Sequence, residues 1–252
     1  VEGWELKPVA YVLGLTNLIL HGIDIPNYEY VDSLKTEYSS ISPKDQVDVI
    51  LANPPFGASI ADGLETNFPA TYRCKESADL FVILMLKLLK PGGRCAVVLP
   101  DGSISGGGVK ARIREKLLND CNLHTIIRLP QSTFFPATVS TNLLFFEKGI
   151  PTKDIWFYQH QLPVGRKSYS KTKPIQFNEF EQIIEWWNDR GENEFAWKVN
   201  IKNIKDFDLD IQNPNKIEES FNYSSNQVAV DLNESFKKSK NLLKSIEEML
   251  NG

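Results

Sequence analysis

Residues 47–57 read VDVILANPPFG, and this stretch decides the fold that we expect for the chain. Its first six residues form a short, mostly apolar run, which predicts a buried β-strand. The strand ends on Asn53-Pro54-Pro55-Phe56, where two prolines prevent the ladder from continuing. A polar, stiff loop directly after a buried strand is typical of the carboxyl edge of an open α/β sheet, where such folds bind ligands.

Similar apolar runs, separated by helical patterns, lie on both sides of this strand. Pro8 suits the first turn of a helix, and Gly22 suits the position just after its end. Continuous apolar strands that alternate with helices predict a mostly parallel sheet covered on both faces. The helices are expected at residues 8–21, 79–89 and 109–119, and the strands at 3–6, 28–31, 47–52, 95–99, 125–129 and 142–147.

The pattern changes after Gly149. A strand at 155–158 precedes a basic loop, GRKSYSKTK, and a helix at about 178–190, whereas residues 196–215 are mixed and rich in turns. The amphipathic end, residues 230–250, has apolar residues at near-helical spacing. We therefore divide the chain into a catalytic domain (1–150), an extension (151–215) and a helical tail (216–252).

Composition limits the class of protein. The 252 residues include 28 basic and 32 acidic side chains, for a net charge of -4. Since nucleic-acid binding usually needs a basic field, any such surface must be local or supplied by a partner. The three scattered cysteines indicate reduced thiols in a cytoplasmic protein without a metal site. The apolar run at residues 9–20 is too short to span a membrane, and no membrane partner is expected.

The loop after the central strand presents two hydrogen-bond acceptors. The Asn53 side-chain oxygen and the Pro54 carbonyl oxygen can accept both hydrogens of an amino group, and the consecutive prolines hold them in place. Phe56 then offers a face for a base that has been flipped out of a duplex. The alternative interpretation is an ordinary turn followed by a core aromatic residue.

The segment VDVILANPPFG is similar to the catalytic motif of amino-methyltransferases. Other strings resemble one family in particular, the modification (M) subunits of type I restriction-modification systems. The resemblance covers residues 1 to about 215. The strings that carry it are GWELKPVAYVLGLTNLILHGI, LKPGGRCAVVLPDG, STFFPATVSTNLLFFEKG, YSKTKPI, EWWNDRGENEFAWKV and DFDLDIQNP.

This resemblance implies a Rossmann-like α/β methyltransferase sheet with a C-terminal, mostly helical extension. It also implies transfer of a methyl group from S-adenosylmethionine to adenine N6 in DNA. Glu5 would bind the ribose hydroxyls, while Asp32 and Ser33 would receive the adenine of the methyl donor. The alternatives are a solvated acid at a helix start for Glu5 and a turn aspartate for Asp32. Phe135 would lie against the target base, although Phe134 or a core role fits nearly as well.

The resemblance further implies partners. In this family a specificity (S) subunit reads the DNA sequence, usually with two M subunits for each S subunit, and restriction (R) subunits join them. DNA, an S subunit, a second M subunit and an R subunit are therefore the expected partners. The amphipathic end would pack either on the S subunit or on its own domain.

One element of the family pattern is not found in residues 1–252. The family has a glycine-rich turn of the kind DPACGTGGF, after a first strand that lies between the strands ending at Glu5 and Ala52. We therefore expect a fragment with two unpaired strand edges, which binds the methyl donor poorly on its own. Gly106-Gly107-Gly108 is interpreted as a flexible connection and no substitute. Two other functions stay open: methylation of RNA adenine or protein glutamine, and a non-catalytic assembly role.

Overall fold

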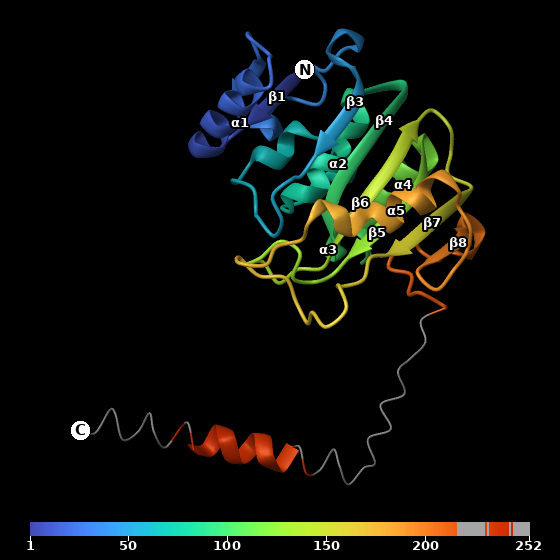
Figure 1. Cartoon of the computed structure of the whole chain (residues 1–252). Helices are drawn as coiled ribbons and strands as arrows, with labels where there is room; N and C mark the ends of the chain where they lie inside the picture. Colours follow the sequence, from blue (N-terminus) through green and yellow to red (C-terminus); the bar gives the residue numbers. More distant parts are fainter. Residues whose placement is uncertain (216–229, 231, 242, 244–252) are drawn as a thin grey trace. The chain divides into compact units, whose positions relative to one another are not determined.

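The computed structural model describes residues 1–215, 230, 232–241 and 243 (Figure 1). Residues 1–215 form one compact unit, and residues 216–252 form a second. The helices and strands of the first unit are β1 (Glu2–Glu5), α1 (Pro8–Leu20), β2 (Asn27–Tyr30), β3 (Val47–Ala52), α2 (Ser77–Leu88), β4 (Leu89–Pro100), α3 (Asp101–Ile104), α4 (Val109–Asp120), β5 (Cys121–Leu129), β6 (Thr141–Lys148), β7 (Asp154–Gln159), α5 (Glu181–Asn188) and β8 (Ala196–Asn200).

Six strands form the main sheet in the order β3-β4-β6-β5-β7-β8. Strands β3, β4, β5 and β7 run in one direction, whereas β6 and β8 run in the other. The expectation of a mostly parallel sheet is therefore wrong for the pairing around β6, which is antiparallel to both of its neighbours. The cause is the connection from β5 to β6, because residues 130–140 turn the chain back at the edge where β5 ends.

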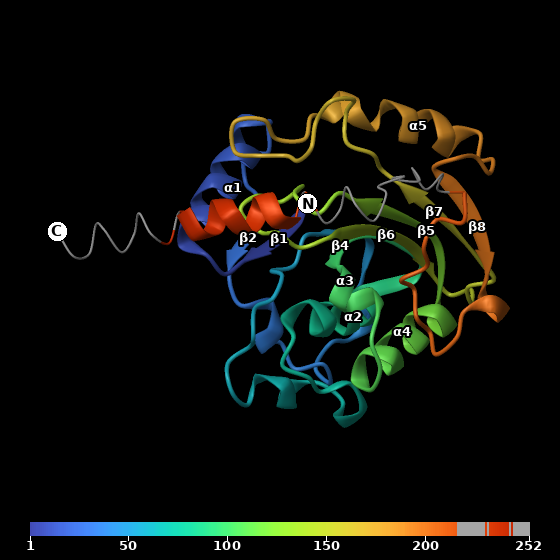
Figure 2. The ribbon, with the colours of Figure 1, turned by 90° about the horizontal axis from the view of Figure 1, so that it is seen from below.

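Helices cover both faces of this sheet. Figure 2 shows α5 on one side and α2 and α4 on the other. The larger core lies under α2 and α4, where Ile83, Leu117 and Phe146 are almost fully buried. A smaller core lies under α5 and is built around Ile127 and Trp186. The sheet is thus held between two apolar layers, the architecture of an α/β protein.

The segment from α2 to β4 differs from its predicted boundaries. Helix α2 begins at Ser77 rather than at residue 79, and β4 begins at Leu89 rather than at residue 95. The register of β3 against β4 shifts between Val47, opposite Leu89, and Val49, opposite Arg94. Residues Pro91-Gly92-Gly93, a turn signal in the sequence, therefore form an irregularity inside one long strand.

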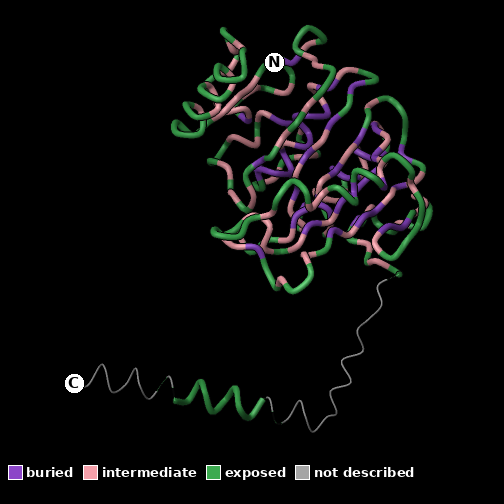
Figure 3. Tube along the Cα trace, viewed as in Figure 1, coloured by how far each residue is buried: buried purple, intermediate pink, exposed green. Residues whose placement is uncertain are grey.

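Strands β1 and β2 form a separate parallel pair. Helix α1 packs on it through Tyr11, whose ring stacks on Tyr28 at 5.3 Å between centroids. The predicted helix ends are confirmed, because Pro8 begins α1 and Gly22, just past its end, has a left-handed φ of 83°. No residue of α1 is buried, as Figure 3 shows by its green and pink trace. Its apolar residues are therefore exposed or only partly covered in the structure.

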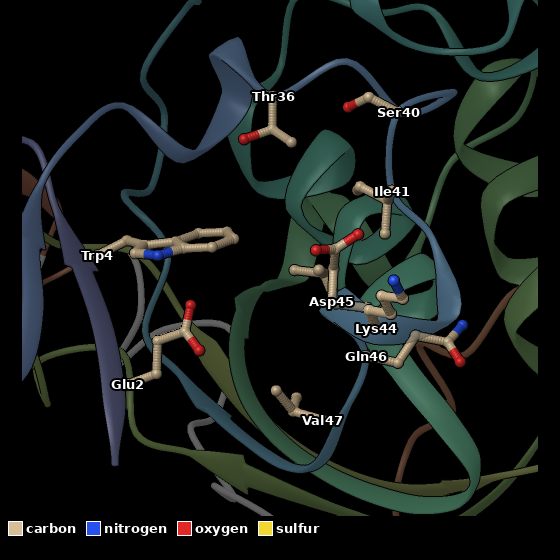
Figure 4. Close-up of a pocket in the computed structure, with 10 residues that line it drawn as sticks. Glu2, Trp4, Thr36, Ser40, Ile41, Lys44, Asp45, Gln46 and Val47 are labelled. Carbon is tan, nitrogen blue, oxygen red and sulfur yellow. The ribbon is translucent and has the colours of Figure 1, made fainter.

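The two sheets are separated between β1 and β3. Within residues 1–215, β1 pairs only with β2, and β3 pairs only with β4, so each has one edge without a strand. Leu51 on β3 is 80 % exposed. The starts of β1 and β3 line a common cavity of about 390 Å³ (Figure 4), with Glu2 and Trp4 opposite Asp45 and Val47. The expected pair of open edges is thus confirmed.

Residues 151–215 continue the main sheet. Strand β7 pairs parallel with β5, and β8 pairs antiparallel with β7. Strand β8 lies in a segment that the sequence analysis interpreted as turns, and that interpretation is wrong for residues 196–200. The division at residue 150 stays a proposal about which part is specific to the family.

The second unit is described only in part. Residues 232–241 are helical, and the apolar side chains Leu232, Phe236 and Leu243 are exposed. Ile246 and Leu250, which belong to the predicted amphipathic pattern, lie outside the described residues.

Candidate active site

The loop Asn53-Pro54-Pro55-Phe56 leaves the carboxyl end of β3 and is fastened to the start of α2. The Ser77 hydroxyl donates a hydrogen bond of 3.0 Å to the Pro55 carbonyl oxygen. The backbone N–H of Ser77 donates to the carbonyl oxygen of Ala58 at 3.2 Å. Since Ser77 is itself buried and begins a helix, the loop is held at two points by a rigid element.

Two acceptors of this loop accept no hydrogen bond from the residues that the structure describes. The Asn53 side chain is exposed, and it makes no hydrogen bond within residues 1–215. The Pro54 carbonyl oxygen is likewise without a donor in the described structure, whereas the next carbonyl, of Pro55, is taken by Ser77. Asn53 is thus exposed, whereas Pro54 is a buried residue, and their predicted role as a pair of acceptors for an amino group stays a prediction.

Aromatic side chains lie beside these acceptors. The ring of Phe56 contacts that of Phe134 edge-on, at 5.3 Å and 74°. Phe134 comes from the β5–β6 connection and also packs on the core under α5. Phe135 is 54 % exposed. The structure thus joins Phe134 to the loop and leaves the Phe135 ring in solvent.

Gly57 ends the loop in a conformation that favours glycine. Its φ is 62°, in the left-handed region, and a Cβ there would meet nothing within 4 Å. The constraint at this position is therefore the backbone angle rather than space, and a β-branched residue would be strained.

The candidate donor-binding residues lie at the carboxyl ends of the two small parallel strands. Glu5 ends β1 and Asp32 follows β2, and the Val31 N–H donates to the Glu5 carbonyl oxygen at 3.0 Å. Each carboxylate has one oxygen in local use: Glu5 Oε1 accepts from the Lys7 N–H at 2.7 Å, and Asp32 Oδ1 accepts from the Leu34 N–H at 3.1 Å. The second oxygen of each accepts no hydrogen bond within residues 1–215.

Ser33 begins the short turn that Asp32 caps, and its hydroxyl makes no hydrogen bond in the described residues. The local bonds of Glu5 and Asp32 match the alternatives of a helix-start acid and a turn aspartate. They leave a role in ligand binding possible at the free oxygens, so both residues stay candidates.

A cavity of about 390 Å³ lies elsewhere. It lies beside Glu2 and Val47, where β1 and β3 begin, and therefore at the edge of the sheet opposite to Asn53 (Figure 4). In open α/β sheets the ligand lies at the carboxyl edge. We therefore assign this cavity to the separation between the two sheets and not to the site.

Two buried charged residues of the fold were not predicted by the sequence analysis. Arg114 is 3 % exposed, and its guanidinium donates to the carbonyl oxygens of Phe207, Ser105 and Gly106. Asp79, 2 % exposed, pairs with Lys110 at 3.0 Å. No signal in the sequence distinguished them, because an arginine in a helical pattern or an aspartate in a first helical turn is common on solvated surfaces.

The described residues offer no group of three or more His, Cys, Asp or Glu side chains that could hold a metal ion. Among the same residues, no helix is both long and apolar enough to cross a membrane.

Comparison with known proteins places the chain in one family. The family N-6 DNA Methylase matches residues 1–222. The EcoEI type I restriction enzyme methylase subunit of Escherichia coli is 48% identical over 225 residues, which are 85% of this chain and 46% of that protein. The StySPI methylase subunit of Salmonella potsdam is 34% identical, over 69% of this chain and 34% of that protein. The chain thus spans less than half the length of these relatives.

Solved structures agree. A modification subunit of a putative type I restriction enzyme from Vibrio vulnificus YJ016 superposes with a TM-score of 0.81 at 42% identity, covering 86% of this chain and 48% of that one. A chain from a study of complex assembly and conformational transition in a type I R-M system gives a TM-score of 0.80 at 34% identity, covering 99% of this chain and 54% of that one. The fold predicted from the sequence, an α/β methyltransferase sheet, is confirmed.

Proposed function

The chain belongs to the N-6 DNA methylase family, and from that premise we propose that it is part of the modification subunit of a type I restriction-modification system. In this proposal it helps to transfer a methyl group from S-adenosylmethionine to adenine N6 in DNA. Its own contribution is the target-base side of the site, the loop Asn53-Pro54-Pro55-Phe56.

The observation that carries the proposal is that neither acceptor of this loop, the Asn53 side-chain oxygen or the Pro54 carbonyl oxygen, accepts a hydrogen bond in the described residues. The nitrogen of an adenine amino group is a weak nucleophile because its lone pair is delocalised into the ring. Asn53 Oδ1 and the Pro54 carbonyl oxygen would each accept one amino hydrogen, which favours a pyramidal nitrogen with its lone pair directed at the methyl carbon. Both oxygens also stabilise the positive charge that develops on nitrogen, and they are held before the reaction starts.

The loop is built to keep that arrangement. The Pro54 ring fixes its own φ, and Ser77 holds the next carbonyl, so the Pro54 carbonyl has little freedom to turn away. Phe56 and Phe134, edge to face, offer an aromatic surface for an extrahelical base. This explains why a side-chain amide, two prolines and an aromatic residue occur together.

The residues proposed to bind the methyl donor form part of the site that S-adenosylmethionine would need. The open oxygens of Glu5 and Asp32 lie after adjacent parallel strands, where a carboxylate can accept from a ribose diol and from an adenine amino group. When bound, S-adenosylmethionine would supply an electrophilic methyl group on a sulfonium. Glu5, Asp32 and Ser33 are thus our candidates for holding its adenosine part.

The proposal includes the family's partners. We expect DNA as the substrate, with an S subunit, a second M subunit and an R subunit in the assembly. The net charge of -4 agrees with a subunit that shares DNA binding with others. Such a complex acts on DNA in the cytoplasm, where we expect it.

The test is product analysis. The natively expressed protein, purified with any subunits that accompany it, is incubated with S-adenosylmethionine and unmodified DNA, and the nucleosides are separated by mass spectrometry. We expect N6-methyldeoxyadenosine. Methylation of RNA adenine or of protein glutamine instead would make the substrate wrong, and transfer to none of the three amines would favour the assembly role.

A further inference from the structure

Residues 165–173, the basic loop of the sequence analysis, are fixed to the protein by one buried tyrosine. Tyr169 is 2 % exposed, although its neighbours Lys167 and Ser168 are exposed. Its hydroxyl donates to Glu179 Oε2 at 2.6 Å and lies 3.2 Å from His160 Nε2. Burial, and then the hydrogen bond to Glu179, raise the Tyr169 pKa, so the hydroxyl stays a donor. The basic loop is therefore anchored rather than merely solvated.

A second bond ties the basic loop to the target-base side of the site. The backbone N–H of Tyr169 donates to Ser132 Oγ at 2.7 Å. Ser132 lies two residues before Phe134, whose ring contacts Phe56. The loop follows β7, which runs in the same direction as β3, so it leaves the sheet at the edge where Asn53 lies.

The outer side of the basic loop carries uncompensated positive charge. Lys167, Lys171 and Lys173 are exposed, and no ion pair joins them to a carboxylate in the part of the chain that the structure describes. Arg166 is different, since it pairs with Glu179 at 3.4 Å. A tight turn, in which Ser170 and Lys173 exchange backbone hydrogen bonds of 3.1 Å, holds Lys171 at its tip.

We propose that the basic loop binds the phosphate backbone of duplex DNA beside the extrahelical target base. Lysine is a compact charge that suits phosphate, and the hydroxyls of Ser168 and Thr172 between the lysines are further donors of the kind that contact phosphate oxygens. The buried anchor limits the freedom that binding would otherwise remove. The inference rests on the proposed function for its partner, DNA.

The phosphate contact would also help the reaction, because it would position the DNA strand relative to the site. A phosphate held by Lys171 and Lys173 sets the register of the strand, while Ser132 and Tyr169 connect that register to the loop that carries Phe134. Sequence discrimination is not expected from these residues, because phosphate contacts are the same for every base.

The test compares two double variants of the natively purified protein. Lys171→Ala/Lys173→Ala removes the two outermost charges of the basic loop. Lys153→Ala/Lys202→Ala is the matched control, since both of these lysines are exposed and lie at the opposite edge, where β7 begins and β8 ends. DNA affinity is measured by fluorescence anisotropy on a labelled duplex over a series of salt concentrations, and thermal unfolding midpoints verify that both variants fold.

The proposal predicts weaker binding by Lys171→Ala/Lys173→Ala on every duplex sequence. The slope of log affinity against log salt should become shallower by about one to two, because each lost phosphate contact contributes about 0.9. The control should keep the wild-type affinity and slope. A folded loop variant with the wild-type slope, or one that loses only a copurifying subunit, would overturn the inference. The proposed function would fail separately, by the lack of N6-methyldeoxyadenosine with the wild-type protein.

Discussion

The Ser77 hydroxyl holds the Pro55 carbonyl oxygen at 3.0 Å, which fastens the candidate catalytic loop to the first residue of α2. The bond occupies one carbonyl of the loop, whereas the neighbouring carbonyl, on the buried Pro54, accepts no hydrogen bond within residues 1–215. Ser77 therefore acts on the proposed reaction through the loop, as a positioning residue.

Replacement of Ser77 by alanine should lower kcat by about tenfold through loss of alignment. The free energy of unfolding should fall by only about 1 kcal/mol, as expected for one neutral hydrogen bond. KM for the methyl donor should change little, because the loop contacts the target base. Ser77→Thr, which keeps the hydroxyl, should recover most of the rate. An alanine variant with wild-type kcat would show that the bond does not position the loop.

Arg114 should be a major contributor to stability. Its buried guanidinium donates hydrogen bonds to the carbonyl oxygens of Ser105, Gly106 and Phe207. Arg114→Ala should lower the free energy of unfolding by about 2–4 kcal/mol, measured by urea denaturation. Arg112→Ala, on the exposed side of the same helix, is the control and should cost less than about 1 kcal/mol. If both variants lost the same free energy of unfolding, Arg114 would not have this role in stability.

The contribution of the buried Tyr169 hydroxyl to the free energy of unfolding should likewise be measurable. Tyr169→Phe removes the donor to Glu179, a hydrogen bond to a carboxylate that is worth about 1.5–3 kcal/mol. Tyr30→Phe is the control, since Tyr30 is exposed and its hydroxyl bonds to nothing in residues 1–215. Chemical denaturation should separate the two variants. If they were equally stable, Tyr169 would not anchor the basic loop.

Acid should destabilise the protein through His124. Burial, and after it the charge of Arg190, lower the pKa of His124 from 6.5 to about 4. Between these values the unfolded chain binds a proton that the folded protein does not, so stability falls as the pH falls from about 6.5 towards 4. Partial exposure limits the effect to about 1 kcal/mol. The variant His124→Gln should lose less stability over this pH window, measured by thermal unfolding. If the variant lost as much stability as the wild-type protein, His124 would not be the cause.

Most of the strands, and the stiff loop that follows β3, could be predicted because their signals are local. An apolar run followed by Asn53-Pro54-Pro55 specifies a strand and a stiff loop without reference to the rest of the chain. Pro8 and Gly22 likewise mark the ends of α1 by backbone preferences alone. These features depend on residues that are close in sequence, which is where sequence patterns are informative.

Other features depend on partners far along the chain. Strand β6 inserts between β4 and β5, which no pattern within its own residues reveals. Leu89 belongs to β4 because Val47 pairs with it across a bulge, although Pro91-Gly92-Gly93 indicates a turn. The positioning role of Ser77 and the buried hydrogen bond of Tyr169 could not be predicted, because only the fold shows that Pro55 and Glu179 lie beside them.

The central claim, that the Asn53 side chain receives the amino group of the target, is tested most directly by kcat for N6-methyldeoxyadenosine formation. Asn53→Ala should lower kcat by about 10²–10³ at saturating DNA and methyl donor, the usual effect of losing one preorganised polar contact to the transition state. Asn119→Ala, an exposed asparagine on α4, should retain the wild-type rate. A folded Asn53→Ala variant that methylates DNA at the wild-type rate would contradict the account.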